Sequence, residues 1–218
     1  MLQTPAADFR AVDSAQPVLI SNLGTTLHDD PKILRGLAEI FARDEAVALH
    51  GVLQAGFLEM LLSICRRASF VPQRIGLPGM RRVEAAPAIA GKALRTALFR
   101  PAFLRWLECV TGCGSLASAQ GEVSEIGPQG DERLSWHDDR HQPSRRLGIT
   151  INLSERDFDG GHFEMRRGRA PQIVFRHTHA GLGDALIFRV RDGLEHRVLP
   201  VTAGGPRRVF AGSFAAVS

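Results

Sequence analysis

A histidine and an aspartate separated by one residue, His137 and Asp139, carry the clearest chemical signal in the chain. In an extended segment, side chains two positions apart point to the same side, so an imidazole and a carboxylate can converge on one metal ion. A third candidate ligand, His196, follows the apolar run 185–188 across a short polar loop. Two histidines and one carboxylate leave three coordination positions open, as in non-haem Fe(II) sites that bind a cosubstrate and O2. The pair alone is weak evidence, because His-x-Asp also occurs by chance on surfaces.

An arginine eleven residues after His196, Arg207, is a candidate anion-binding residue. The turn at 204–206 predicts a short hairpin that places Arg207 on the strand beside the one with His196. A guanidinium binds a carboxylate through two parallel hydrogen bonds, which suits the far carboxylate of a 2-oxo diacid whose other end chelates the metal.

Arg208 is a rival for this role, because a bulge at the turn would exchange the two faces of strand 207–214. Without a bulge, Arg207 shares its face with small residues, whereas Arg208 shares its face with Phe210 and Phe214. The phenylalanine face predicts packing against a second layer, and the small face leaves room for a cosubstrate. We therefore favour Arg207.

The elements that must position these residues change character near Gly114. Before it, apolar residues at helical spacing predict helices from Pro31, Gln54 and Pro101, with one strand at 46–52. After it, apolar and polar residues alternate, with Gly, Pro or Asp about every ten residues, which is typical of a sandwich or barrel. The predicted strands are 121–126, 147–153, 162–167, 172–177, 185–190, 197–201 and 207–214.

The strand 147–153 predicts how the two parts meet. One of its faces is apolar (Leu147, Ile149, Ile151, Leu153) and the other is small and polar (Gly148, Thr150, Asn152). We expect the apolar face to pack under the helices and the other face to line a ligand cavity. The expected fold is α+β, mainly β: a double-stranded β-helix jelly roll with N-terminal helices packed on one sheet. We expect one domain over 1–218, with a helix-rich part at 1–115 and the jelly-roll core at 116–218.

Composition narrows the class of protein. Of the 218 residues, 44% are hydrophobic and 23% are charged, which is ordinary for a globular chain. No apolar run is long enough to span a bilayer, no signal peptide is recognisable, and the three cysteines form no CxxC pair, so we expect a cytoplasmic protein with reduced thiols and no membrane partner. The basic residues are scattered, and the cluster at 166–169 lacks interleaved aromatic residues, so we expect no nucleic-acid partner.

From about residue 120 to 218 the chain resembles the Fe(II)- and 2-oxoglutarate-dependent dioxygenases, in particular their prolyl-4-hydroxylase-like branch. The segments that carry the resemblance occur in one order with family-like spacing: Ile126-Gly127-Pro128, Trp136-His137-Asp138-Asp139, Ile151-Asn152-Leu153-Ser154, Gly160-Gly161-His162-Phe163-Glu164, Gly183-Asp184-Ala185-Leu186-Ile187-Phe188 and His196-Arg197-Val198-Leu199-Pro200-Val201, leading to Arg207.

The resemblance implies that His137, Asp139 and His196 are the catalytic iron ligands and that Arg207 anchors 2-oxoglutarate. It implies Fe(II), 2-oxoglutarate and O2 as reactants, with ascorbate as a stimulant. Many relatives place a tyrosine before the His-x-Asp strand, but this chain has no tyrosine. Thr150 or Asn152 are candidates to replace it. The interval from His196 to the anchor is also one residue longer than in many members, which keeps Arg208 as a rival.

The resemblance further implies a hydroxylase that acts on a C–H bond of a peptide or protein residue or of a small molecule and releases succinate and CO2. Nucleic-acid demethylation ranks lower, because the basic residues form no binding stripe. A cupin-like metal-binding module, or a pseudoenzyme without turnover, is the alternative from another class, and it would leave 2-oxoglutarate intact. The pair His177 and His179 has no flanking metal ligand, so we expect it at a solvated strand end.

Overall fold

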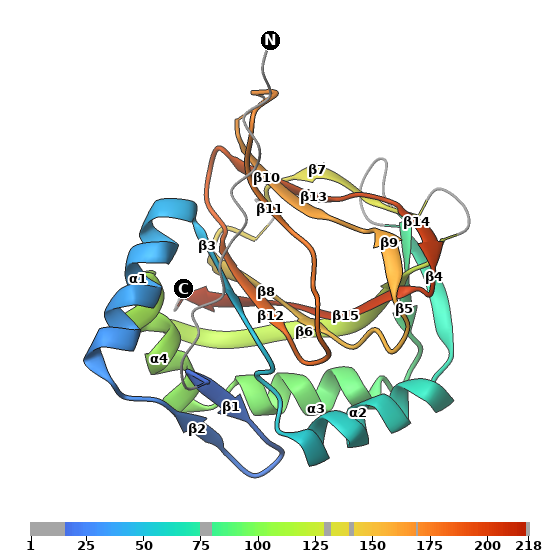
Figure 1. The fold of residues 1–218 in the computed structure, drawn as a ribbon, viewed down its shortest axis with the longest axis horizontal. Helices are drawn as coiled ribbons and strands as arrows, with labels where there is room; N and C mark the ends of the chain where they lie inside the picture. Colours follow the sequence, from blue (N-terminus) through green and yellow to red (C-terminus); the bar gives the residue numbers. More distant parts are fainter. Residues whose placement is uncertain (1–15, 75–79, 129–131, 140–141, 169, 217–218) are drawn as a thin grey trace.

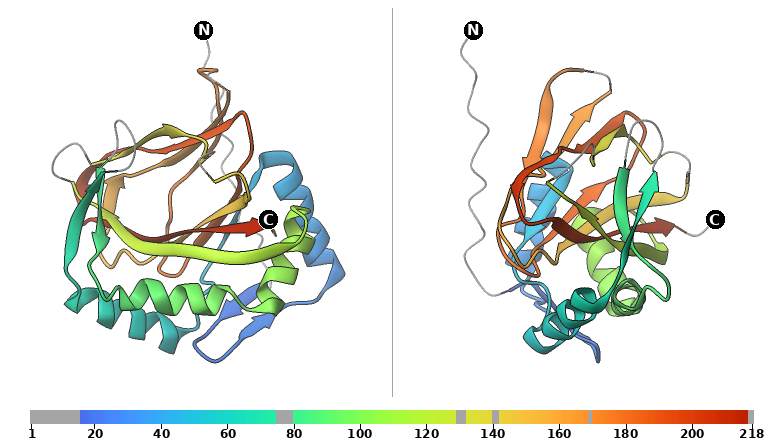
Figure 2. Two further views of the ribbon diagram at one scale, coloured as in Figure 1. Left: turned by 180° about the vertical axis from the view of Figure 1, so that it is seen from behind. Right: turned by 90° about the vertical axis from the view of Figure 1, so that its right-hand side faces the viewer.

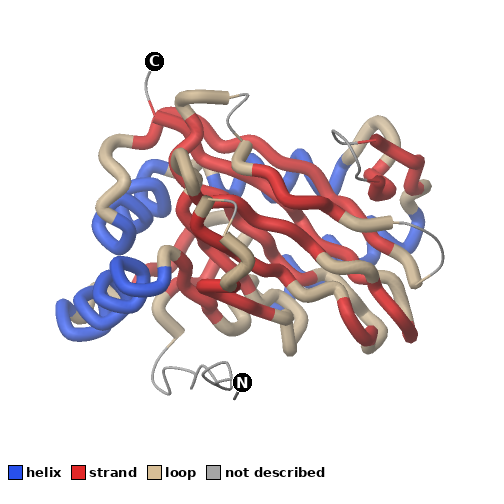
Figure 3. The backbone as a smooth tube through the Cα atoms, turned by 90° about the horizontal axis from the view of Figure 1, so that it is seen from above, coloured by secondary structure: helices blue, strands red, loops and turns tan. Residues whose placement is uncertain are grey.

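The computed structural model describes residues 16–74, 80–128, 132–139, 142–168 and 170–216, and the structural statements below refer to these residues. Two β-sheets face each other, and helices cover the outer side of the larger sheet and one of its ends (Figures 1 and 3). The helices are α1 (Pro31–Asp44), α2 (Ala55–Arg67), α3 (Ile89–Leu98) and α4 (Pro101–Thr111).

Local signals determine where the helices begin and end. The Asp30 side chain accepts a hydrogen bond of 2.8 Å from the Lys32 backbone N–H, and Pro31 occupies the first turn of α1, where a missing N–H costs nothing. Gly112 ends α4 in the left-handed conformation with φ of 59°. Both predicted boundaries are confirmed. Helix α3 was not predicted.

The larger sheet has seven strands in the order β3-β12-β8-β15-β6-β5-β4, and the smaller has four in the order β11-β10-β13-β7. Two small pairs, β1-β2 and β14-β9, complete the strands. The strands are β1 (Val18–Ile20), β2 (Thr25–Leu27), β3 (Ala46–Leu49), β4 (Phe70–Arg74), β5 (Met80–Glu84), β6 (Leu116–Ile126), β7 (Leu134–His137), β8 (Arg145–Asn152), β9 (Phe158–Gly160), β10 (Phe163–Arg167), β11 (Ile173–His177), β12 (Ala185–Arg189), β13 (Leu194–Val198), β14 (Val201–Gly204) and β15 (Arg207–Ala216). All the strand pairs are antiparallel.

The alternation in the strands separates two cores. Ile149 and Ile151 of β8 join the apolar core between the large sheet and the helices, and Phe214 of β15 meets Phe103 of α4 edge-on at 6.0 Å. Burying each such side chain stabilises the fold by about 1.5–3 kcal/mol. The other face of the sheet looks toward the small sheet across a second core that includes Phe163 and Phe188. The two-faced strand predicted at 147–153 is therefore confirmed, and Figure 2 shows α2 and α3 along one side of the large sheet.

Two sequence expectations about strand arrangement are wrong. The strand predicted at 197–201 lies instead at 194–198, because Pro200 has no N–H to donate to a ladder, so His196 is in the middle of a strand. The predicted hairpin between that strand and the strand of Arg207 does not form. Strand β15 pairs with β6 and β8 in the large sheet, whereas β13 belongs to the small sheet.

Five short strands in the described residues before 115 lie beside the helices, of which only β3 was predicted. Strand β4 contains Pro72 at the edge of the large sheet, where a missing N–H is tolerated, and such short polar strands have no clear alternation. Within the described residues, no helix has the length and apolar character needed to cross a membrane.

Candidate metal centre

His137 and His196 are brought together by strand pairing within the small sheet. His137 is the last residue of β7, and His196 is its direct cross-strand partner in β13. Directly opposed residues of an antiparallel pair have closely spaced side chains. The centroids of the two imidazole rings are 4.1 Å apart.

Asp139 reaches the histidines through a turn. It lies two residues beyond the end of β7, and its φ of 58° is in the left-handed region, which aspartate tolerates better than most residues. The side chains of His137 and Asp139 converge as expected. The expected reason, an extended His-x-Asp segment, is wrong, because the backbone turns at Asp139.

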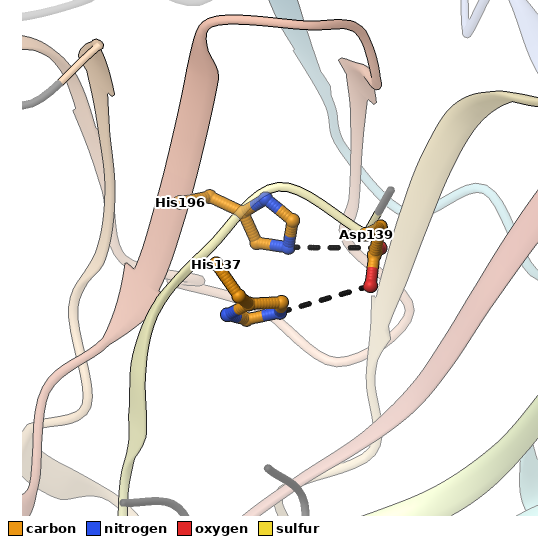
Figure 4. Close-up of side chains that lie close together, drawn as sticks. All are labelled: His137, Asp139 and His196. Carbon is orange, nitrogen blue, oxygen red and sulfur yellow. Dashed lines mark ion pairs between the residues drawn. The ribbon is translucent and has the colours of Figure 1, made fainter. Parts of the chain in front are cut away.

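The carboxylate of Asp139 lies 3.9 Å from Nε2 of His137 through one oxygen and 3.9 Å from Nε2 of His196 through the other (Figure 4). One ligand atom from each residue lies within 4.8 Å of the other two. Two nitrogens and one oxygen at this separation can surround a single metal ion and leave its other side open.

The protonation states also suit metal binding. Nδ1 of His137 lies 2.7 Å from the backbone carbonyl of Ser135, so Nδ1–H donates there and Nε2 keeps its lone pair. Burial lowers the pKa of His196 to about 3, with the charge of His137 as a further cause. Burial raises the pKa of Asp139, but the charges of His196, Arg145 and His137 outweigh this and hold it below its usual value. At neutral pH the carboxylate is charged.

Arg145 was not predicted as a site residue. It begins β8, and its Nη1 lies 2.7 Å from Oδ2 of Asp139. Its Nη2 donates to Oε1 of Gln142 at 2.9 Å. The ion pair fixes one carboxylate oxygen and leaves the other accessible. No local sequence signal identifies Arg145, because 25 arginines are scattered along the chain.

Arg207 occupies the space between the two sheets without an acidic partner. Its residue is 4% exposed, it forms no ion pair with any described residue, and burial lowers its pKa to about 10. Gly161, with φ of +60°, makes room for it, since a Cβ there would lie 2.8 Å from Cδ of Arg207. Arg208 lies on the opposite face, where it pairs with Glu125 at 3.0 Å and covers the ring of Phe70. The predicted separation of the two faces is confirmed.

Thr150, His179 and His177 form a chain of polar side chains, and the charge of Arg207 acts on both histidines. Oγ1 of Thr150 lies 2.9 Å from Nε2 of His179, whose Nδ1 lies 3.4 Å from Nε2 of His177. The expected solvated strand end is wrong, because His179 is only 7% exposed and lies between the sheets. Burial, and then the charge of Arg207, lowers the pKa of His177 to about 4 and that of His179 well below its usual value, so both rings are neutral at pH 7.

Asn152, the other predicted substitute for a tyrosine, is not brought into this group. Its Nδ2 donates to the carbonyl of Gly181 at 2.8 Å, and its Oδ1 accepts from the Ser154 backbone N–H at 3.1 Å. Both atoms of the amide therefore hold neighbouring loops.

A cavity of about 400 Å³ contains the three candidate ligands, with Thr150 in its wall. A second cavity, of about 570 Å³, shares Asp139 and Arg145 with the first and is also lined by Asp138. Asp138 is outside the group of three ligands, as expected. Asp139 therefore lies where the two cavities adjoin, whereas His137 and His196 line the 400 Å³ cavity.

Comparisons with known proteins agree with this geometry. The family model described as the 2OG-Fe(II) oxygenase superfamily matches residues 122–215. No curated protein sequence matches the chain. Among solved structures, a Pseudomonas putida prolyl-4-hydroxylase is similar, with 19% identity over 85% of this chain and 100% of that chain and a TM-score of 0.63.

Two further structures have the same fold. A Trichoplax adhaerens prolyl hydroxylase, solved with a hypoxia inducible factor peptide, has 11% identity over 84% of this chain and 89% of that chain, with a TM-score of 0.63. The epimerase SnoN, solved with Fe3+, alpha ketoglutarate and nogalamycin RO, has 18% identity over 86% and 85%, with a TM-score of 0.63. Residues 122–215 thus match the 2OG-Fe(II) oxygenase superfamily, whose members use Fe(II) and 2-oxoglutarate, and the chain has the double-stranded β-helix fold seen in the similar prolyl hydroxylases.

Proposed function

We propose that this oxygenase is a hydroxylase in which His137, Asp139 and His196 hold Fe(II) and Arg207 holds 2-oxoglutarate. The observation that carries the proposal is the convergence of two imidazoles and one carboxylate in the same intersheet space as a buried guanidinium that has no acidic partner among the described residues. The donor set fits Fe(II), because imidazole and carboxylate without thiolate are its usual ligands in oxygenases.

Each residue has a separate task in this proposal. Bound Fe(II) supplies the O2 chemistry that splits 2-oxoglutarate into succinate and CO2 and oxidises a C–H bond of the substrate. Arg207 binds the distal carboxylate of 2-oxoglutarate, and Thr150, which contacts His179, offers a hydroxyl donor beside it. Arg145 keeps Asp139 ionised and oriented. The apolar side chains Phe163 and Phe188, which line the cavity, exclude water.

The substrate in this proposal is a peptide residue or a small molecule. Of the similar structures, one was solved with a peptide and another with nogalamycin RO, so the fold accommodates both classes. We place the enzyme in the cytoplasm, which the three free cysteines support, and expect ascorbate to stimulate it.

An anaerobic titration with Fe(II) and 2-oxoglutarate tests the proposal without a known substrate. A visible charge-transfer band that needs both additions is expected, followed by succinate release when O2 is admitted. A cupin-like binding module would bind metal and leave 2-oxoglutarate unchanged. Absence of the band in protein that binds Fe(II) would refute the proposal.

A further inference from the structure

We infer that the substrate of this site is a small organic acid whose carboxylate binds Arg81 and Arg95 in the cavity that contains the candidate iron ligands, an inference that rests on the proposed function. The cavity volume of about 400 Å³ is in the range of small-ligand pockets, about 300 to 1,000 Å³. The inference concerns the wall of the cavity on the β5, β6 and α3 side.

Three arginines from three separate elements line this cavity together with the candidate iron ligands. Arg81 comes from β5, Arg95 from α3 and Arg145 from β8. Arg81 and Arg145 have carboxylate partners, Glu122 and Asp139, whereas Arg95 has none among the described residues, so the cavity has an excess of positive charge that an anion can balance.

The hydrogen-bond donors of these arginines are incompletely used. The buried Nε–H groups of Arg81 and Arg145 have no hydrogen-bond partner among the described residues. Arg95 forms no ion pair with any described residue. These Nε atoms are closed to solvent, so a ligand can reach only the terminal nitrogens, and Arg95, which has no ion pair with a described residue, offers its donors to the acceptor oxygens of a ligand. Burial also lowers the pKa of Arg81, despite the opposite charge of Glu122, which it contacts.

The balance of charge points in the same direction. Fe(II) and the 2-oxoglutarate dianion cancel each other, and Asp139 is balanced by Arg145, its ion-pair partner. The remaining charged groups in the described lining are Arg81 and Arg95 against the single carboxylate of Glu122. The lining of the loaded cavity is therefore positive by one charge and favours a substrate that carries negative charge.

Apolar residues complete the site. Leu134, Phe163, Phe188 and Val198 line the cavity on the side of the small sheet and β12, close to His196. An acid with a short hydrocarbon chain can therefore bind with its carboxylate at the arginines and its carbon chain toward the metal centre. An internal residue of a neutral peptide segment would leave Arg95 without an anionic partner among the described residues.

The test uses the full-length protein loaded with Zn(II) and saturating 2-oxoglutarate, so that no turnover occurs, and measures binding of three probes by calorimetry. The probes are hexanoate, hexanamide and hexyl phosphate. We expect hexanoate to bind wild type at least about tenfold more tightly than hexanamide. Arg95→Gln and Arg81→Gln should each lower the ratio of hexanoate affinity to hexanamide affinity about tenfold. Tighter binding of hexyl phosphate than of hexanoate would overturn the choice of a carboxylate.

Arg35→Gln is the matched control, because Arg35 is exposed on α1, does not line the cavity, and its loss changes the net charge equally. Arg95→Gln keeps the test valid if Arg81→Gln fails to fold, since no ion pair is lost with Arg95. Arg145 is not substituted because it contacts Asp139. Equal affinity of wild type for hexanoate and hexanamide, no binding of hexanoate, or an unchanged preference in Arg95→Gln would overturn the inference. Failure of the proposed function would appear separately, as no 2-oxoglutarate binding by wild type.

Discussion

Arg207→Met is the substitution that separates a cosubstrate anchor from a structural arginine. Removing a charge-assisted contact with a carboxylate in a closed site should weaken 2-oxoglutarate binding by about 2–4 kcal/mol, or about 30- to 1000-fold in Kd. Holding the guanidinium between the sheets also has a cost. A fall of its pKa from 12.5 to about 10 corresponds to about 3 kcal/mol of unfavourable burial.

Methionine fills a similar space without carrying a charge. In the protein without metal and 2-oxoglutarate, Arg207→Met should therefore raise the free energy of unfolding, by up to about 3 kcal/mol. Arg208→Met is the matched control. Arg208 pairs with Glu125, which also contacts Arg82 at 2.9 Å, and it covers Phe70. Its loss should lower the free energy of unfolding on the order of 2 kcal/mol and leave 2-oxoglutarate affinity unchanged.

The assay combines anaerobic titration of the Fe(II) proteins with 2-oxoglutarate, followed through the charge-transfer band, and urea unfolding of the proteins without metal. A large loss of affinity confined to Arg208→Met would reverse the assignment. A loss of stability in Arg207→Met without a change in 2-oxoglutarate affinity would show that Arg207 is structural. Unchanged affinity in both variants would remove both arginines from cosubstrate binding.

Three further predictions test the metal centre and its surroundings. His137→Ala, Asp139→Ala and His196→Ala should each lose bound iron and succinate release, whereas Asp138→Ala keeps both; full activity of the His196 variant would refute the ligand set. Ni(II), Co(II) and Zn(II) bind imidazole and carboxylate ligands at least as tightly as Fe(II) does, so protein purified with one of these ions should be inactive. Removing the ion with a chelator and adding Fe(II) and ascorbate should restore succinate release. Turnover with Zn(II) alone would contradict an oxygenase. The pKa of His177 is about 4 in the folded protein against 6.5 for a free imidazole, so between these pH values the unfolded chain binds more protons than the folded chain. The contribution of His177 to stability therefore falls as the pH falls through that window. Between pH 7 and 5, wild type should lose up to about 2 kcal/mol more free energy of unfolding than His177→Gln, measured by urea unfolding; equal losses would show that His177 is not buried in its neutral form.

The sequence by itself determined those features that depend on neighbouring residues. A proline and an aspartate at the start of α1 and a glycine after α4 are local signals, because they satisfy or remove the unpaired N–H and C=O groups of a helix end. The alternation along 207–214 placed Arg207 and Arg208 on opposite faces, since successive side chains of a strand point in opposite directions. The types of the three candidate iron ligands were likewise readable, because ligand chemistry belongs to the residue.

Tertiary structure alone decided which of these residues meet. The pairing of β15 with β6 and β8 instead of β13, and the entry of His179 between the sheets, depend on contacts between distant segments. The turn at Asp139 is an exception to the extended pattern that its neighbours predict. Arg81, Arg95 and Arg145 share one cavity although they belong to a strand, a helix and another strand. No local pattern encodes such convergence, because it results from how the sheets and helices pack and not from the preference of any one segment.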